Sequence, residues 1–254
     1  MSNMIAVFVL LLAAGLSLFG CQQGDPNPFF NKGVAYFQQG DTVKAVAEFN
    51  QAVKVKRNFA PGYYNLGICN FKPGAYAQAN QYFFKAVKYD PAYVSAYYSL
   101  SMAYVAMDSL PKAKEVLYLG LKRNPNASVL HYNLGYIFLL RGQADSARWA
   151  FKRVTELDPQ NSDGFFNLAY SSVDPKYYDE AISALRKAVE IDTMNMQAYY
   201  LLGTKLLVNR TPTPAEMKEG IYALERYLKN TKVVDMKVET NIQIANDALA
   251  KVKK

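Results

Sequence analysis

The sequence predicts an all-α solenoid in which helical hairpins stack one on another. A fixed step of 34 residues links five alanines: Ala45, Ala79, Ala113, Ala147 and Ala181. The same step links five large apolar residues: Phe49, Phe83, Leu117, Phe151 and Leu185. A constant period of this length is typical of one helical hairpin per repeat. We therefore expect one elongated domain with small residues where two helices meet and large ones between hairpins.

The first 20 residues are uncharged and mostly apolar, which indicates a signal peptide. Leu18 to Cys21 follows and resembles a bacterial lipobox, which predicts lipidation of Cys21. Phe19 is bulkier than that pattern usually has, and the segment before it lacks Lys and Arg. An uncleaved membrane anchor and a simple secretory signal are the two alternatives. Residues 21 to 27 are expected to form a short tether.

Six hairpins are expected within residues 28 to 231. Their first helices are predicted at 28 to 39, 62 to 72, 95 to 107, 128 to 141, 162 to 173 and 196 to 208. Their second helices are predicted to begin near Thr42, Ala75, Leu110, Ala144, Tyr177 and Ala215. Turn signals such as Gly40-Asp41 and Asp158-Pro159 separate the helices. The sixth hairpin is degenerate, because Gly220 and Leu224 take the Ala and Phe positions about five residues late.

The last segment, residues 232 to 254, is predicted to be a capping helix. Apolar residues lie on one face of it: Val234, Val238, Ile242, Ala245, Leu249 and Val252. The other face is polar, as the exposed end of a solenoid requires.

The repeat columns resemble those of the tetratricopeptide-repeat (TPR) family. One stretch, Tyr-Asn-Leu-Gly, occurs at 64 to 67 and again at 132 to 135, and a variant occurs at 166 to 169. A proline column adds Pro91, Pro125 and Pro159. The resemblance implies a right-handed superhelix, and it leaves the function open.

In the TPR family the first helix of each hairpin lines an inner groove, so the resemblance places a set of aromatic and amide residues there. The predicted partner-binding residues are Tyr64, Asn65, Tyr98, Met102, Tyr132, Asn133, Tyr136, Phe166, Asn167, Tyr170 and Tyr200. Aromatic faces bury apolar side chains, and amides both donate to and accept from a peptide backbone. The asparagines resemble the ladder of glycosyltransferase superhelices, although Ser99 and Leu201 interrupt it. Hairpin packing is the alternative role for these columns.

The charge distribution favours a protein or membrane partner over nucleic acid. The chain has 29 Lys and Arg against 21 Asp and Glu, for a net charge of +8. The basic residues gather on the second helices, apart from the aromatic columns that would stack bases. A solvated outer face is one interpretation, and attraction to anionic lipid or an acidic partner is the other.

No motif for catalysis, a cofactor or a metal is present. His131 is the one histidine and falls in an aromatic packing column, and Cys69 is expected to be a buried thiol. The sequence therefore predicts a non-enzymatic scaffold without cofactor or metal that binds a protein or peptide segment. Its resemblance to envelope lipoproteins implies a lipid-anchored location in envelope assembly or secretion, with the outer membrane favoured. A glycan-binding scaffold in polysaccharide export and an adaptor using the basic face are the alternatives.

Overall fold

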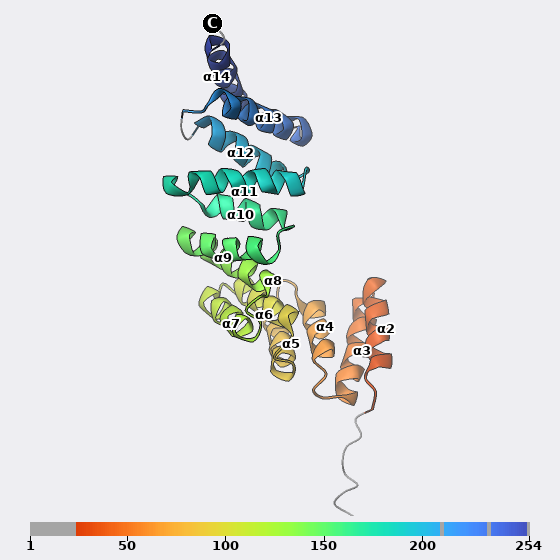
Figure 1. The fold of residues 1–254 in the computed structure, drawn as a ribbon. Helices are drawn as coiled ribbons and strands as arrows, with labels where there is room; N and C mark the ends of the chain where they lie inside the picture. Colours follow the sequence, from red (N-terminus) through yellow and green to blue (C-terminus); the bar gives the residue numbers. More distant parts are fainter. Residues whose placement is uncertain (1–23, 209–210, 233–234, 253–254) are drawn as a thin grey trace, which may run out of the picture. The chain divides into compact units, whose positions relative to one another are not determined.

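The computed structural model describes residues 24–208, 211–232 and 235–252. Over these residues it contains thirteen α-helices, one short 3₁₀ helix and no strand (Figure 1). This confirms the predicted all-α class. The predicted signal peptide and Cys21 lie outside the described residues. Among the residues described, no helix has the length and apolar character needed to cross a membrane.

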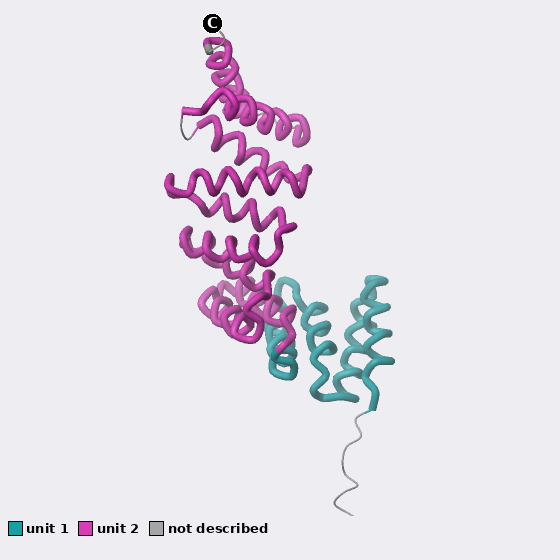
Figure 2. Tube along the Cα trace, viewed as in Figure 1, with its two compact units in different colours: residues 1–91 teal, residues 92–254 magenta. Residues whose placement is uncertain are grey.

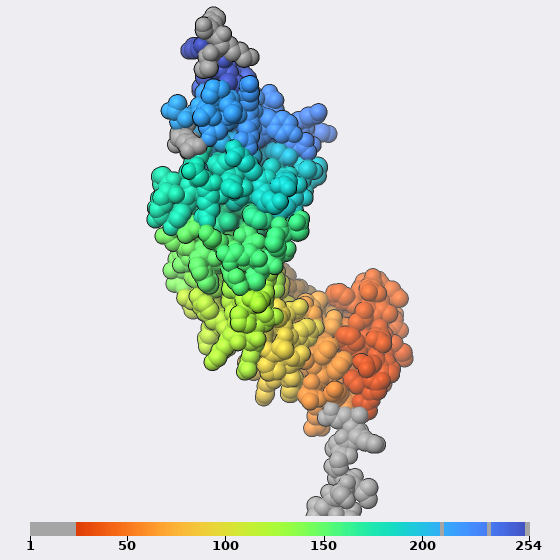
Figure 3. All heavy atoms as spheres, viewed as in Figure 1, coloured from red at the N-terminus to blue at the C-terminus, as the bar shows by residue number. Residues whose placement is uncertain are grey.

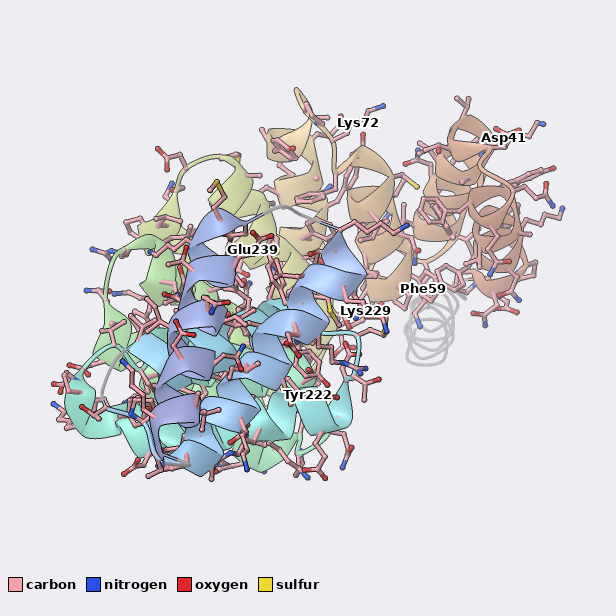
Figure 4. The ribbon with its side chains drawn as sticks, turned by 90° about the horizontal axis from the view of Figure 1, so that it is seen from above. Asp41, Phe59, Lys72, Tyr222, Lys229 and Glu239 are labelled. Atoms are coloured by element: carbon pink, nitrogen blue, oxygen red, sulfur yellow. The ribbon has the colours of Figure 1, made fainter. Side chains whose placement is uncertain are left out.

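The chain forms two compact units, residues 1–91 and 92–254 (Figure 2). In the first unit, four helices form two antiparallel pairs: α2 (Asn27–Gln38) with α3 (Thr42–Val55), and α4 (Ala60–Asn70) with α5 (Tyr76–Tyr89). Asp41 and Lys72, in the turns within these pairs, lie at one edge of the unit, and Phe59, in the turn between the pairs, lies toward the other (Figure 4).

The second unit continues the same pattern. Its helices are α6 (Val94–Ala106), α7 (Leu110–Arg123), α8 (Ser128–Leu140), α9 (Ala144–Leu157), α10 (Ser162–Ser171), η1 (Pro175–Tyr177), α11 (Tyr178–Ile191), α12 (Met196–Val208), α13 (Pro214–Thr231) and α14 (Met236–Val252). Each first helix packs on the second helix that follows it, and α6 also contacts α8 as α10 contacts α12. The colours change in successive bands along this unit in Figure 3, as expected when sequence neighbours form each layer.

The hairpin turns follow the 34-residue period in their backbone conformation. Gly40, Gly74, Asp108 and Gly142 all have positive φ, at 81, 82, 54 and 66°. Glycine adopts this region without a Cβ clash, and Asp tolerates it better than most residues. The fifth turn departs from the pattern, because Asp174 caps the short η1 helix instead, accepting a hydrogen bond from the Lys176 backbone N–H.

The predicted packing columns are buried. All five column alanines are fully inaccessible, and Phe49, Phe83, Leu117, Phe151 and Leu185 are 0–1% exposed. Burial of this kind is the main stabilising term in a helical stack.

Each large residue of this column faces a small residue on the first helix of its hairpin, and the size of that small residue differs between hairpins. A Cβ added to Gly33, Gly67 or Gly135 would overlap the ring of Phe49, Phe83 or Phe151, and at Gly135 the three nearest atoms are ring atoms at 2.8–2.9 Å. The two column leucines occur in repeats with Ser101 or Ala169 at the glycine position, and both residues are fully buried. Each phenylalanine is thus matched with glycine, and Leu117 and Leu185 with a slightly larger residue, whereas in the register-shifted sixth hairpin Gly203 meets Leu224.

The C-terminal part closes the second unit. Helix α13 begins with a capping box, in which Thr213 and Glu216 exchange hydrogen bonds with each other's backbone N–H groups. Helix α14 packs on α12 and α13 and buries Val238 and Ala245. Val234, predicted on the same face, lies outside the described residues.

Candidate partner-binding groove

The aromatic column predicted to line the groove is half-buried at Tyr64, Tyr98, Tyr132, Phe166 and Tyr200. In the first unit, the Tyr64 ring packs 5.8 Å from Phe83. In the second unit, the Tyr132 ring meets Phe151 edge-on at 5.5 Å, and burial raises the pKa of its phenol. Tyr98 and Met102 are half-buried as well. Tyr64 and Tyr132 thus pack against the second helix of their own hairpins, which is the structural role weighed from the sequence.

The asparagines use their amide groups to hold the fold together. The Asn65 amide donates to the Pro61 carbonyl at 2.9 Å. Asn167 donates to the Asp163 carbonyl at 2.8 Å and to the Tyr132 hydroxyl in the preceding repeat at 3.1 Å.

Asn133 is only 2% exposed, and its amide donates to the Ser101 hydroxyl in the preceding repeat. Asn133, predicted from the sequence as a partner-binding residue, is therefore buried. A periodic column shows which residues are equivalent, but it does not show which of them reach the surface.

The groove opens at the C-terminal end of the column. Phe166 and Tyr170 on α10, Gln197, Tyr200 and Leu201 on α12, and Tyr227 on α13 line a pocket of about 220 Å³. Its walls are aromatic: the Phe166 and Tyr170 rings lie 6.0 Å apart, and the Tyr200 and Tyr227 rings 5.1 Å apart. Tyr170 is 55% exposed at the rim, and Tyr136 is exposed on the preceding first helix.

Three of the pocket residues, Phe166, Tyr170 and Tyr200, were predicted from the sequence, and Gln197 and Tyr227 were not. Gln197 lies one turn before Leu201 on the same face of α12. Tyr227 belongs to a second helix, and the shift in register before α13 removes it from the repeat columns.

A second pocket adjoins the end of α10. Ser172, Val173, Asp174, Pro175, Tyr178 and Lys205 line a space of about 310 Å³. The Lys205 Nζ donates to the Ser172 carbonyl at 3.3 Å, and the Tyr178 hydroxyl donates to the Lys205 carbonyl at 3.1 Å. Burial lowers the pKa of the Lys205 ammonium. Lys205 was not predicted as a site residue.

Part of the basic face, on α9 and α11, is neutralised by neighbouring acids. Arg148 and Lys152 on α9 both bind Glu180 on α11, at 2.8 and 3.0 Å. Further ion pairs join Arg186 to Glu219, Arg153 to Glu156 and Lys187 to Glu190. The charges that would attract an anionic partner are therefore partly used within the fold.

His131 and Cys69 have the packed positions expected of them. The His131 Nε2–H donates to the Pro125 carbonyl at 2.9 Å, its ring meets Trp149 edge-on at 5.9 Å, and burial lowers its pKa. Cys69 is a free, buried cysteine whose pKa is raised by burial. Within the residues that the structure describes, no three His, Cys, Asp or Glu side chains gather as a metal site.

Comparison with known proteins agrees with this architecture. A TPR-repeat model matches residues 33–74, and two tetratricopeptide-repeat models match residues 98–162 and 162–193. The chain therefore contains tetratricopeptide repeats and has the fold of a TPR solenoid. No curated protein sequence matches it.

Several solved TPR structures are similar in fold. MamA (residues 41 to the end) from Desulfovibrio magneticus RS-1 is 20% identical over 68% of this chain and 98% of that one, with a TM-score of 0.57. YrrB, described as a TPR protein with an unusual peptide-binding site, is 22% identical over 72% and 94%, with a TM-score of 0.54. A thermophilic TPR protein of Thermus thermophilus is 24% identical over 72% and 100%, also with a TM-score of 0.54.

Proposed function

We propose that this protein is a non-enzymatic scaffold that binds an extended segment of a partner protein along the first helices of its second unit. The aromatic pocket between α10, α12 and α13 is the observation that supports this proposal most directly. An extended segment would place one apolar side chain among the Phe166, Tyr170, Tyr200 and Tyr227 rings.

The size of the pocket favours a single side chain. Small-molecule and cofactor sites commonly enclose about 300–1,000 Å³, and this pocket encloses about 220 Å³. YrrB, a TPR protein of similar fold, has a peptide-binding site.

The alternatives have less support. A sugar needs several polar partners for its hydroxyl groups, and the pocket surface is almost wholly apolar. Part of the basic face is not free to serve an adaptor, because Arg148, Lys152 and Arg186 are paired with carboxylates. His131, the one histidine of the chain, is only 6% exposed, which does not favour a role as a general base.

We place the protein in the cell envelope, anchored to a membrane by acyl chains on Cys21. The apolar first 20 residues and the lipobox-like Leu18 to Cys21 support this. Several acyl chains hold a protein on a bilayer stably, whereas a single chain does not. A role in envelope assembly or secretion follows from the resemblance to lipoproteins of this architecture. Labelling with a palmitate analogue tests the anchor, since a Cys21→Ser variant that still labels would contradict it.

A matched pair of tyrosine variants tests the groove. Tyr170 lies in the pocket and is 55% exposed, whereas Tyr118 lies on α7 and is 48% exposed. Because neither is buried, both Ala variants should fold. Tyr170→Ala should weaken capture of a partner from envelope extract by about tenfold or more, since aromatic anchors dominate such interfaces, and Tyr118→Ala should leave capture unchanged. Equal capture by the two variants would contradict the proposal.

A further inference from the structure

The pocket around Lys205 arises from two departures from the repeat pattern. Four of the other five residues in the Ser172 column are large, namely Tyr36, Tyr104, Phe138 and Leu206, whereas Asn70 is smaller. The Lys205 column otherwise contains Ala35, Cys69, Ala103, Ile137 and Ser171, and the last four are buried. A small residue thus replaces a large one at the end of α10, and a lysine replaces small or apolar residues on α12. Together these changes open a space and direct an ammonium group to its wall.

The Lys205 charge has little compensation from the fold. Within the described part of the chain, its Nζ has one hydrogen bond, a 3.3 Å contact with the Ser172 carbonyl, and no carboxylate pairs with it. Asp174, which also lines the pocket, pairs with Lys176 at 2.9 Å. A half-buried ammonium group is stabilised when an anion or a further acceptor reaches it. The pocket of about 310 Å³ leaves room for such a group.

The two pockets lie in sequence along one face of α12. Gln197 and Leu201 line the aromatic pocket and Lys205 lines the polar one, and the three are spaced at four-residue intervals. Four residues of helix rise about 6 Å, which is about the length of two residues of extended peptide. This spacing suits one extended segment that reaches both pockets.

We infer that the Lys205 pocket binds a carboxylate of the same peptide segment whose apolar side chain enters the aromatic pocket. This inference rests on the proposed function and makes it more specific: the preferred ligand has an apolar residue and, about two residues away, a carboxylate. The carboxylate comes from an Asp or Glu side chain or from the C-terminus of the peptide. Ser172 is not a ligand through its side chain, because its hydroxyl donates to the Leu168 carbonyl.

Synthetic positional-scanning libraries of 12-residue peptides test this. One library has amidated C-termini and the other has free ones, and both are probed with the epitope-tagged full-length chain in mild detergent. We expect selection of an apolar residue followed or preceded by a carboxylate at a fixed spacing. Selection of Asp or Glu in the amidated library would identify a side-chain carboxylate, and selection only with free C-termini would identify the C-terminal one.

Two variants address Lys205 directly. Lys205→Met keeps the length of the side chain without its charge, and should weaken binding of the selected peptide by about tenfold or more, since a hydrogen-bonded ion pair is lost. Ser172→Phe restores the ring that Phe138 supplies one repeat earlier and should block the pocket. Lys229→Met, at an exposed lysine on α13 (Figure 4), is the control for the loss of one positive charge and should bind as the unmodified protein does. Thermal unfolding followed by circular dichroism confirms that each variant is folded.

The outcomes separate this inference from the proposed function. Apolar selection without any preference for a carboxylate, or a preference that persists in Lys205→Met, would overturn the inference and leave the groove proposal standing. If the unmodified protein selects no peptide more strongly than the Tyr170→Ala variant does, the groove proposal is overturned, and this inference with it.

Discussion

Replacing Gly135 by Ala tests whether the matched small and large residues determine how closely two helices of a hairpin approach. The new Cβ would lie 2.8–2.9 Å from three ring atoms of Phe151. Overpacking of this kind costs about 1–3 kcal/mol. Removing a glycine from a helix interior gains about 1 kcal/mol. The net effect on the free energy of unfolding should therefore be a loss of about 0–2 kcal/mol.

The same substitution should behave differently once the ring is gone. Phe151→Leu gives the hairpin the residue found at Leu117 and Leu185, and adding Gly135→Ala then reproduces the pair Ala169 and Leu185. In that background Gly135→Ala should stabilise by up to about 1 kcal/mol. The coupling energy between the two positions should thus be about 1–3 kcal/mol in favour of the double variant.

Urea unfolding of the four proteins, followed by circular dichroism, measures this coupling. All four are compared under one set of conditions, because a stack of repeats need not unfold in a single step. A Gly135→Ala substitution that costs the same in both backgrounds would refute the argument that the Phe151 ring is what requires glycine.

Three further predictions concern individual side chains. Burial alone would raise the pKa of Glu180, but hydrogen bonds from Lys152 and Arg148 lower it overall. The folded state therefore favours the ionised carboxylate, and Glu180→Gln should reduce the free energy of unfolding by about 1 kcal/mol. Urea titrations measure this loss, which should be smaller at high salt. Because burial lowers the pKa of His131 in the folded state, the unfolded chain takes up a proton first on acidification. The stability of the unmodified protein relative to His131→Phe should be constant above about pH 7 and should fall as the pH is lowered to 5; parallel pH profiles would contradict this. Thr213→Ala removes one side of the capping box and should lower the local stability of the first turn of α13 by about 1 kcal/mol. Amide hydrogen exchange should therefore be faster in that turn and unchanged in α9.

The helices could be predicted closely because their ends have local causes. Helices α5, α7 and α9 end at Tyr89, Arg123 and Leu157, each just before an Asp-Pro or Asn-Pro pair. Proline disfavours the helical conformation in the residue before it, so the sequence is sufficient to locate these ends. The packing columns were equally predictable, because the same contact recurs in every hairpin.

The candidate site was predictable only in part, because exposure depends on neighbours outside the column. Tyr132 and Tyr170 are both aromatic groove residues by position, yet Tyr132 accepts a hydrogen bond from Asn167 while Tyr170 remains 55% exposed. Tyr227 lies beyond the break in register that precedes α13. For Lys205 a signal existed: a lysine in a column of small and apolar residues is unusual, and comparison along that column would have found it.

The pairing of glycine with phenylalanine also determines where repeats could be exchanged by recombination. A crossover in the turn at Gly142 would join Gly135 to a second helix from another repeat, and the reverse junction would set Ser101 or Ala169 against a phenylalanine ring. A crossover near Pro125 or Pro159 moves both members of the pair together. Duplication and shuffling of this array should therefore be tolerated when the junctions fall between hairpins, and the hairpin, rather than the single helix, is its unit of inheritance.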